Sequence, residues 1–359
     1  MLTSIPAKMA GVQLMGHGDV DQLVYRTDIP VPQPAADEVL IRVGAAGINN
    51  TDINTRIGWY AKSVRGATGE TAKQTEDIEG GSWSGAAMKF PRIQGLDCCG
   101  TVVAVGAGVD AGRIGDRVLV RPMQSLHDAD NPYAFVTFGS EMDGAFAQYA
   151  KVASRQALAV DCDWSDVELA SLPCAYSTAE GMLTRAGVGA ERVLITGASG
   201  GVGSAAVQLA KRRGAEIVAV AAEAKAADVR ALGADRIVFR GQSIRQAVRN
   251  VSIDVVIDIV GGPQWPELCD VLRAGGRYVT SGAIAGPIVE LDLRTLYLKD
   301  LTLFGSTYQP DEIFTNLIGY VERDEIRPVV AKTYPLKDIV VAQQEFLAKR
   351  HTGKLVLLP

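Results

Sequence analysis

The sequence has few cysteines and no long apolar run, and these two absences exclude several classes of protein. The 359 residues include five cysteines, an odd number without Cys-x-x-Cys spacing, which indicates reduced thiols rather than a disulfide framework. Nowhere do about 18 apolar residues follow one another, which argues against a membrane-spanning helix. The opening residues, "MLTSIPAKMAGVQLMGHGDV", lack the basic-then-apolar order of a secretory signal. We therefore expect a cytoplasmic protein with no membrane partner.

Charge of one sign is not concentrated anywhere in the chain. The net charge is -5, with acids and bases interspersed, and no basic stripe indicates a nucleic-acid partner. The composition is 47% hydrophobic and 21% charged, with 38 glycines, so the chain can bury a sizeable core. Its length favours two domains over one. These values are typical of an enzyme with a small-molecule substrate.

The first part of the chain, to about residue 160, predicts a compact antiparallel β-rich domain. Short apolar runs such as "EVLIRVGAAGI", "GTVVAVGAGV" and "DRVLVRP" are punctuated by Gly and Pro. Residues 62–89 break this rhythm with a polar segment rich in Gly, Ser and Thr. They form either a solvated surface insertion or a mobile flap over a substrate cleft, in which case Trp83 is a candidate cleft residue.

From about residue 166 the pattern changes to alternating strands and helices. A helical stretch, "SDVELASLPCAYSTAEGMLTRAG", precedes the first of several strands that alternate with helices. The strands are expected at "RVLITG", "EIVAVAA", "DRIVF", "IDVVIDIVG" and "GRYVTSG", with helices at 201–213, 224–232 and near 264–273. Such alternation predicts an α/β fold with a parallel sheet covered on both faces.

The strongest motif lies in "RVLITGASGGVGSAAVQLAKRRGAEIVAVAA". Ala198-x-Gly200-x-x-Gly203 is a G-x-G-x-x-G pattern with Ala in its first place, between a buried strand and a helix. Gly200 lets the main chain approach a pyrophosphate, Gly203 lets the helix pack closely, and free N–H groups at the helix N-terminus face the anion. We expect the pyrophosphate to be bound by Ala198, Ser199, Gly200, Gly201, Val202 and Gly203.

The end of the second strand favours NADP(H) over NAD(H). An NAD site usually ends this strand with an acid that accepts from the ribose 2′-OH, but here it ends Val220-Ala221-Ala222. Lys225 lies just beyond, and Arg240 follows the third strand, so both are candidates to bind a 2′-phosphate. The alternative is that both are solvated surface cations, and Glu223 nearby disfavours an anion.

Taken together, the motifs resemble those of the medium-chain dehydrogenase/reductase superfamily, most closely its zinc-free quinone-oxidoreductase branch. The likeness runs nearly end to end, from "EVLIRVGAAGINNTDINTRIGWY" and "FPRIQGLDCCGTVVAVGAGV" through "LPCAYSTAEGML" to "HTGKLVLLP". It implies a GroES-like catalytic domain, residues 1–165 and 309–359, interrupted by a doubly wound Rossmann domain, residues 166–308. It also implies a homodimer that pairs through the edge strand "LTLFGSTY", residues 301–308.

The resemblance also implies where the nicotinamide end of the cofactor binds. "DIVGG" resembles the strand end that passes beneath the nicotinamide, and "TSGAIAG" resembles the loop that follows. Cofactor contacts are accordingly expected from Thr178, Gly282 and Ala283.

Zinc members of the superfamily hold their catalytic metal at three places that this chain does not match. Those places correspond to Asn49, Leu96-Asp97 and Cys174, of which only Cys174 is a plausible ligand, whereas catalytic zinc takes three. The region of the structural zinc, residues 121–142, contains no cysteine. We therefore expect no metal, with Cys174 a small buried residue.

Without a metal, hydrogen-bond donors must polarise the substrate oxygen. The resemblance implies catalytic roles for Asn49 as amide donor, for Tyr60 as phenol donor or ring wall, and for Thr51 as proton relay. Asp52 either orients its neighbours or caps a helix, and Asn49 is alternatively a turn residue. His127 is a possible proton source, although a lone loop histidine is more often structural.

These residues predict an NADPH-dependent oxidoreductase that transfers hydride to a quinone or to an activated alkene or enone without metal. Two alternatives stay open: a zinc-type alcohol dehydrogenase, and a non-catalytic NADP(H)-binding relative. Pocket shape, and hence substrate, cannot be derived from the motifs.

Overall fold

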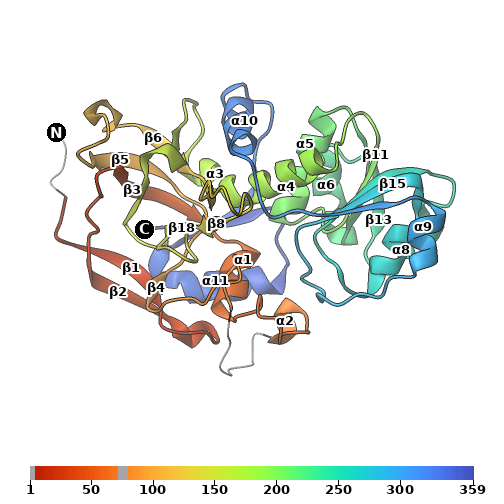
Figure 1. The fold of residues 1–359 in the computed structure, drawn as a ribbon, viewed down its shortest axis with the longest axis horizontal. Coiled ribbons are helices and arrows are strands. Elements are labelled where there is room, and N and C mark those ends of the chain that lie inside the picture. The colour runs from red at the N-terminus through yellow and green to blue at the C-terminus, as the bar shows by residue number, and fades with distance from the viewer. Residues whose placement is uncertain (1–4, 72–79) are drawn as a thin grey trace. The chain divides into compact units, whose positions relative to one another are not determined.

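Residues 5–71 and 80–359 are described in the computed structural model, and they divide into two units (Figure 1). The first unit holds the described residues of Met1–Val64, Thr71–Cys174 and Pro310–Pro359, and the second holds Arg65–Glu70 and Ala175–Gln309. The second unit is therefore inserted between segments of the first in the order of the chain.

The boundaries between these units differ from the predicted domain limits. The division falls after Cys174 rather than after residue 165. Helix α3 (Asp166–Leu169) packs on three strands of the first unit, β3 (Glu38–Gly47), β5 (Cys99–Val105) and β17 (Val330–Pro335). It also falls after Gln309, one residue later than predicted. The short stretch Arg65–Glu70, expected in the first domain, belongs to the second unit, where the Thr68 N–H donates to Ile284 O (3.1 Å).

The first unit is β-rich, as the punctuated apolar runs predict. A three-stranded sheet has the order β2-β1-β4, and a larger sheet has the order β10-β6-β5-β3-β18-β17, with β9 also paired to β3. A third pair joins β7 and β8, and the one parallel pair in these described sheets is β17 with β18. The strands are β1 (Lys8–Leu14), β2 (Leu23–Pro30), β3 (Glu38–Gly47), β4 (Arg92–Ile93), β5 (Cys99–Val105), β6 (Arg117–Val120), β7 (Met123–Ser125), β8 (Phe135–Thr137), β9 (Tyr149–Ala153), β10 (Ala157–Ala159), β17 (Val330–Pro335) and β18 (Lys354–Leu358).

Strand β3 is the central strand of the first unit, and its last residue, Gly47, lies in the core. It is buried along most of its length and pairs with β5, β9 and β18, so its apolar residues form the middle of the core. It ends at Gly47, where a Cβ would lie 2.5 Å from both Ala170 O and the Asp97 carboxylate. Only glycine lets the chain pass here, and α1 (Asn50–Arg56) starts directly afterwards.

The helices around the first unit's sheets are short. They are α3, α10 (Asp311–Glu322) and α11 (Ile339–Ala348), besides α1 and the 3-10 turns η1 (Val20–Gln22), η2 (Ala111–Arg113), η3 (Ser154–Gln156) and η6 (Leu336–Asp338). Helix α2 (Thr68–Thr71) starts in the second unit, and α4 (Pro173–Arg185) starts in the first and continues in the second. Neither is interrupted at the division.

The second unit has the doubly wound parallel sheet that the sequence predicts. Its strand order is β13-β12-β11-β14-β15-β16, and all pairs are parallel. The order reverses between β11 and β14, which is the topological switch point at which such sheets bind ligands. The strands are β11 (Arg192–Ile195), β12 (Glu216–Ala221), β13 (Arg236–Phe239), β14 (Ile253–Asp258), β15 (Leu272–Thr280) and β16 (Thr302–Gly305).

Helices cover this sheet and seal its core. They are α5 (Gly201–Arg212), α6 (Ala226–Ala231), α7 (Ile244–Ala247), α8 (Trp265–Asp270) and α9 (Leu293–Leu298), with 3-10 turns η4 (Glu223–Lys225) and η5 (Gly262–Gln264). One cluster of buried side chains joins β11, β12 and β14 to α7 and α8. Continuous burial on both faces explains why these strands read as unbroken apolar runs rather than alternating ones.

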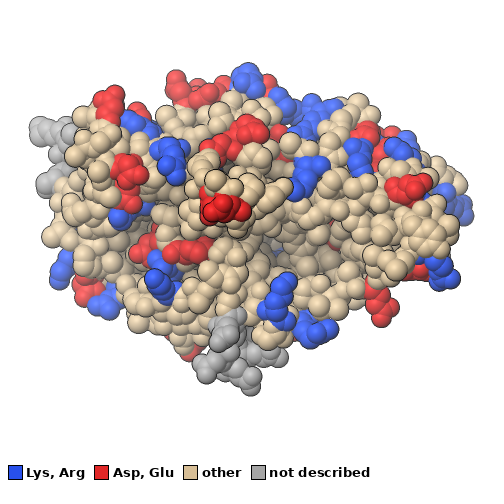
Figure 2. Space-filling view, in the orientation of Figure 1, with Lys and Arg blue, Asp and Glu red and all other residues tan. Residues whose placement is uncertain are grey.

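No helix in the described part of the chain has the length and apolar character needed to cross a bilayer. On the face drawn in Figure 2, basic and acidic side chains are intermixed rather than gathered by sign.

Candidate functional site

In the glycine turn between β11 and α5, the start of the helix lies very close to the residues at the beginning of the turn. Gly203 lies so close to the turn that a Cβ there would come 2.2 Å from Gly197 O. Gly197 has a φ of +59°, a left-handed conformation that favours glycine. Gly200 is the N-cap of α5, and a Cβ there would meet Gly197 O at 3.4 Å, an ordinary contact. Gly203 is thus required by the protein itself, whereas Gly200 is free to serve a ligand.

Backbone donors at the start of α5 fit a pyrophosphate. The N–H groups of Gly201, Val202 and Gly203 have no acceptor within residues 5–71 and 80–359, as expected for a first helical turn. Ala198 is fixed by a hydrogen bond from its N–H to Val220 O (3.1 Å), and Ser199 is nearly buried beside it. A twelve-residue helix adds its dipole to these donors, so the turn can hold an anionic dinucleotide.

Two cations lie near each other beyond the carboxyl ends of β12 and β13. Partial burial and the charge of Arg240 both lower the pKa of Lys225, whereas Asp228 raises it. Arg240 is exposed, and its backbone N–H donates to Ala221 O of β12 (2.9 Å). No acid ends β12. This pair suits a 2′-phosphate, although Glu223 is exposed in the same short η4 turn.

The loops expected near the nicotinamide are bonded to each other. The Ala285 N–H donates to Val260 O (2.9 Å) and the Gly262 N–H to Gly286 O (3.2 Å). A Cβ on Gly261 would lie 3.0 Å from Ala283 Cβ, and one on Gly282 would lie 3.3 Å from Ile259 O. The predicted cofactor residues Gly282 and Ala283 therefore sit in a loop packed directly on the end of β14.

Asp258 organises the end of β14, a role that the sequence analysis missed. Its buried carboxylate accepts from the hydroxyls of Thr196 and Tyr278, both at 2.6 Å, and from the Val260 N–H at 2.9 Å. Burial and the charge of Asp258 raise the pKa of Tyr278, which keeps its phenol a donor. These bonds fix the turn that leads to Gly261. Thr178, the remaining predicted cofactor residue of this unit, is nearly buried in α4.

In the first unit, Asp52 caps α1. The Asn49 N–H donates to Asp52 Oδ2 (2.7 Å), the arrangement in which an acid at N3 reaches back to the N-cap backbone. Asp52 is wholly buried, and Oδ1 has no hydrogen-bond partner among the described residues. Burial, reinforced by the charge of Asp97, raises the pKa of Asp52 to about 7, although the Asn49 N–H and Lys354 lower it.

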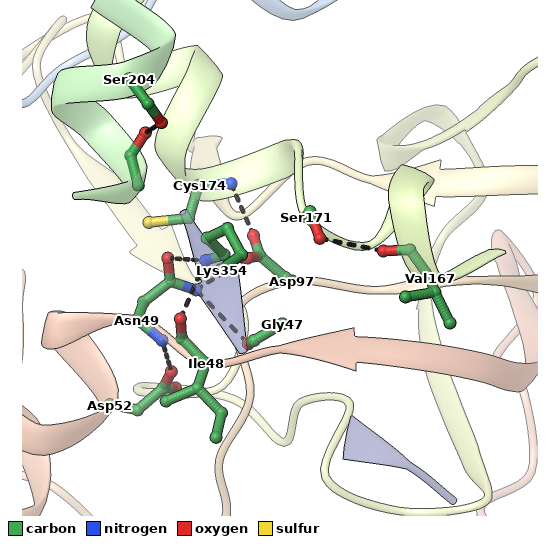
Figure 3. Close-up of polar contacts among 11 residues, drawn as sticks. Gly47, Ile48, Asn49, Asp52, Asp97, Val167, Ser171, Cys174, Ser204 and Lys354 are labelled. Atoms are coloured by element: carbon green, nitrogen blue, oxygen red, sulfur yellow. Dashed lines mark hydrogen bonds and ion pairs between the residues drawn. The ribbon is translucent and has the colours of Figure 1, made fainter. Parts of the chain in front are cut away.

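A buried ammonium occupies the centre of the predicted catalytic region (Figure 3). Lys354 Nζ donates to Asn49 Oδ1 at 2.5 Å, to Asp97 Oδ2 at 2.7 Å and to Ile48 O at 2.9 Å. Asp97 is wholly buried and Lys354 is 3% exposed, so this is a buried ion pair. The other Asp97 oxygen accepts from the Cys174 N–H at 2.6 Å.

The Asn49 amide is engaged on both of its polar atoms. Its Oδ1 accepts from Lys354, and its Nδ2 donates to Asp97 Oδ2 at 2.9 Å. Among the described residues, the second Nδ2 hydrogen has only Gly47 O as a partner, at 3.5 Å, which is long for a good hydrogen bond. Asn49 is therefore more than the turn residue considered as an alternative, but one of its two donors is already committed to the protein.

The residues at the three zinc positions do not fit a catalytic zinc ion. Leu96 is buried and apolar, Asn49 binds the ammonium, and Asp97 is paired with Lys354. Within the described ranges, no group of three or more His, Cys, Asp and Glu side chains is arranged to hold a metal. Cys174 is nearly buried, in keeping with the expected small core residue.

Tyr60 and Thr51, both predicted catalytic residues, lie together. The Tyr60 hydroxyl donates to Thr51 Oγ1 at 3.3 Å, and the Trp59 ring meets the Tyr60 ring edge-on at 5.6 Å. Burial raises the pKa of Tyr60 to about 12, so its phenol stays protonated at neutral pH. The first unit thus brings Asn49, Thr51, Asp52 and Tyr60 onto or next to one short helix.

The segment 62–89 is described only in part, because residues 72–79 lie outside the described residues. Trp83 meets Phe135 of β8 edge-on at 6.3 Å, and the Ser84 hydroxyl donates to Glu141 at 2.6 Å. This end of the segment is therefore anchored to the first unit. The His127 side chain is about half exposed, and its Nε2 lies 3.8 Å from Asp311 Oδ2.

Lys354 is the residue that sequence reasoning missed. It stands in the quoted stretch "HTGKLVLLP", as the one charge at the head of an otherwise apolar strand. A charged residue in such a strand must be either exposed or paired. A lysine followed by four apolar residues was therefore the sign in the sequence that a partner existed.

Two family models match separate parts of the chain. The alcohol dehydrogenase GroES-like domain matches residues 35–161, and the zinc-binding dehydrogenase matches residues 201–323. The acryloyl-coenzyme A reductase of Metallosphaera sedula is 30% identical over 97% of this chain and 99% of its own length. The quinone oxidoreductase of Lama guanicoe is 27% identical over 98% of this chain and 97% of its own length.

Solved structures match over both units. A protein of Sinorhizobium meliloti 1021, provisionally assigned as an alcohol dehydrogenase, has a TM-score of 0.91 and 45% identity, covering 99% of this chain and 98% of its own. The 2-octenoyl-CoA carboxylase reductase CinF, solved with NADP and 2-octenoyl-CoA, has a TM-score of 0.84 and 26% identity, covering 99% of this chain and 88% of its own.

Proposed function

Because the chain belongs to the medium-chain dehydrogenase/reductase superfamily, in its quinone oxidoreductase-like branch, we propose that it reduces a quinone or an activated alkene with NADPH and without a metal ion. Membership of this family makes the protein a nicotinamide-dependent oxidoreductase. The observation that carries the finer proposal is the Lys354–Asp97 ion pair on Asn49, because it engages two residues, Asn49 and Asp97, that the resemblance places at metal-ligand positions.

The class of molecule that accepts the hydride is inferred from the hydrogen-bond donors near Asn49. A conjugated alkene or a quinone accepts hydride more readily than a simple ketone does, because the incoming electron pair is delocalised onto an oxygen that hydrogen bonds can stabilise. Asn49 and Tyr60 are the neutral donors of this region, and Tyr60 keeps its proton at neutral pH. Two of the relatives reported above act, by their names, on α,β-unsaturated thioesters, which are alkenes of this kind.

The proposed reaction balances as a hydride transfer followed by a protonation. The C4–H bond of NADPH breaks and its electron pair forms a C–H bond at the β-carbon, while the alkene electrons move to the carbonyl oxygen. The resulting enolate takes a proton at the α-carbon from water or a site hydroxyl, which leaves NADP+ and a saturated product. The cofactor supplies the hydride, and the protein's residues bind, orient and exclude water.

NADP(H) is proposed over NAD(H) from the residues beyond β12. Ala221 and Ala222 offer no carboxylate to a ribose 2′-OH, and Lys225 and Arg240 offer two cations to a 2′-phosphate. CinF, at 26% identity, was solved with NADP.

The test is a steady-state assay of the purified protein that follows oxidation of NADPH or NADH. The acceptors are an enal, an enone, an enoyl thioester, a quinone and a simple ketone, each with and without a chelator. We expect turnover with NADPH on at least one conjugated acceptor, unchanged by the chelator. Turnover confined to simple ketones or alcohols and abolished by the chelator would instead identify a metal alcohol dehydrogenase. Tight NADPH binding without turnover on any acceptor would identify a non-catalytic relative.

We further propose that the protein acts as a homodimer in the cytoplasm. Strand β16 is the edge of its sheet, and six large apolar residues just before it are between 38% and 71% exposed: Ile288, Val289, Leu291, Leu293, Tyr297 and Leu298. Apolar side chains gathered beside a free strand edge are typical of a protein interface. All five cysteines are free thiols, as a reducing compartment favours.

A further inference from the structure

We infer that Lys354 takes the place of the metal ion as a fixed internal cation and, together with Asp97, positions the Asn49 amide for the reaction. This inference rests on the proposed function and adds to it a positioning residue that no motif assigns. Its starting point is the disagreement between the zinc positions and the residues found there.

The ammonium is held in a complete oxygen cage. An ammonium has three donors and no acceptor, and Lys354 uses all three, on Ile48 O, Asn49 Oδ1 and Asp97 Oδ2. A buried charge is tolerated only when it is paired and hydrogen-bonded, and this one is both. Since no donor is left over, Lys354 does not itself bind a substrate oxygen.

The ion pair determines which way the Asn49 amide faces. The amide atom beside an ammonium must be the oxygen, and the amide atom beside a carboxylate must be the nitrogen, because each charged partner can only donate or only accept. Lys354 and Asp97 are 3% and 0% exposed, so water does not compete for these contacts. A neutral side chain at position 354 would remove the donor that holds the amide oxygen and leave Asp97 as the remaining charged partner of the amide.

With the amide fixed, one donor remains for a ligand. One Nδ2 hydrogen is bonded to Asp97 at 2.9 Å, and within the described part of the chain the other has only Gly47 O, at 3.5 Å. We assign this second hydrogen to the substrate oxygen. The positive charge of Lys354 on the amide oxygen polarises the amide, which strengthens its N–H groups as donors.

The fold holds the ammonium rigidly beneath Asn49. Lys354 is the first residue of β18, which pairs with the end of β3 at Val356 and Gly47, and the Ile48 N–H donates to Leu355 O at 2.9 Å. The preceding residue, Gly353, has a φ of +85°, and a Cβ there would lie 2.2 Å from Val329 O. The turn into β18 is thus as constrained as the strand itself.

The kinetic test compares Lys354→Met, which removes the charge, with Lys354→Arg, which keeps it, and with Asn49→Ala. Lys332→Met, an exposed lysine on the neighbouring strand β17, is the matched control. We expect Lys354→Met to lower kcat about 10- to 100-fold with the KM for NADPH within about twofold. Lys354→Arg should recover part of this loss and Lys332→Met should show none.

A double-mutant cycle shows whether Lys354 acts through Asn49. The Lys354→Met/Asn49→Ala variant should be no slower than Asn49→Ala alone, because both remove the same oriented donor. Additive losses, or a Lys354→Met variant with the kcat of the wild type while Asn49→Ala is impaired, would overturn the inference. If Lys354→Met does not fold, Lys354→Met/Asp97→Asn removes both buried charges together and is read in the same way.

A second readout is independent of turnover and of the proposed function. In protein labelled with ¹⁵N-asparagine, the Asn49 side-chain amide pair is assigned by its disappearance in Asn49→Ala. We expect this pair to shift in Lys354→Met and to stay in place in Lys332→Met. An unshifted pair in Lys354→Met would show that the ion pair does not hold the amide, whereas an inactive wild type with the shift present would sink only the proposed function.

Discussion

A single carboxyl group gives the first unit a pH-dependent stability. The folded pKa of Asp52 is about 7 against an unfolded value of 3.8, so the folded state holds this proton over a range in which the unfolded chain has lost it. The contribution of Asp52 to the free energy of unfolding is largest below about pH 4 and is lost as the pH rises through about 7. Each unit of difference between the folded and unfolded pKa corresponds to ~1.4 kcal/mol.

The corresponding prediction compares wild type with Asp52→Asn in urea unfolding at pH 5 and pH 8. The variant keeps an acceptor for the Asn49 N–H but does not titrate. The free energy of unfolding of the wild type should fall relative to the variant by about 2–3 kcal/mol between these two pH values. Asp130→Asn, an exposed control, should follow the wild type. Parallel curves for Asp52→Asn and wild type would contradict the raised pKa.

The proposed preference for NADPH rests on two further residues, Lys225 and Arg240. Lys225→Ala and Arg240→Ala should each raise the KM for NADPH about 10- to 100-fold, because each removes a charge-assisted hydrogen bond to the 2′-phosphate. Neither should change the KM for NADH, and Arg249→Ala, an exposed arginine of the same unit, should change neither. Equal effects on both cofactors would place these cations outside the 2′-phosphate site.

At the scale of elements, the turn into α5 separates stability from ligand binding. In Gly203→Ala the new Cβ meets Gly197 O at 2.2 Å, so the helix must move away from the turn. We expect a fall in Tm together with weaker NADPH binding. In Gly200→Ala the same distance is 3.4 Å, so Tm should hold while NADPH binding weakens. Calorimetry and fluorescence titration measure the two effects, and an unchanged Tm in Gly203→Ala would count against the close packing.

The same elements show what the sequence can and cannot predict. The parallel sheet and its glycine turn are local patterns, since apolar runs and Gly spacing within about thirty residues specify a strand, a turn and a helix. The cage around Lys354 is not local. Lys354 is 305 residues from Asn49 and 257 from Asp97, and only the pairing of β18 with β3 brings them together.

Other differences between the predicted and observed structure also come from contacts between residues far apart in the sequence. The predicted division after residue 165 overlooked that α3 packs back on β3, a contact between segments far apart in the chain. Thr196 and Tyr278 were likewise invisible as partners of Asp258, because they lie on separate strands that become neighbours only in the folded sheet. The family resemblance implied Asn49 and Tyr60 as candidate donors, but it did not indicate how each side chain is already hydrogen-bonded within the protein.

At the scale of the whole molecule, the exposed apolar residues before β16 predict the assembly state. Leu293→Glu and Leu298→Glu place charges on side chains that are 63% and 71% exposed, so the isolated chain should fold normally. If a second copy covers this surface, each change should weaken the dimer about 30-fold or more, the equivalent of ~2 kcal/mol. Light scattering after size exclusion measures this, with Leu126→Glu, 52% exposed in the first unit, as control. A wild type that is monomeric at micromolar concentration would refute the proposed assembly.

The ammonium at the head of β18 has a consequence for the cell. A charge carried on a side chain arrives with translation, needs no delivery protein and cannot be withdrawn by competing scavengers. If Lys354 replaces a metal ion as we infer, the enzyme would keep its activity where trace elements are scarce, a condition in which zinc-dependent enzymes lose theirs.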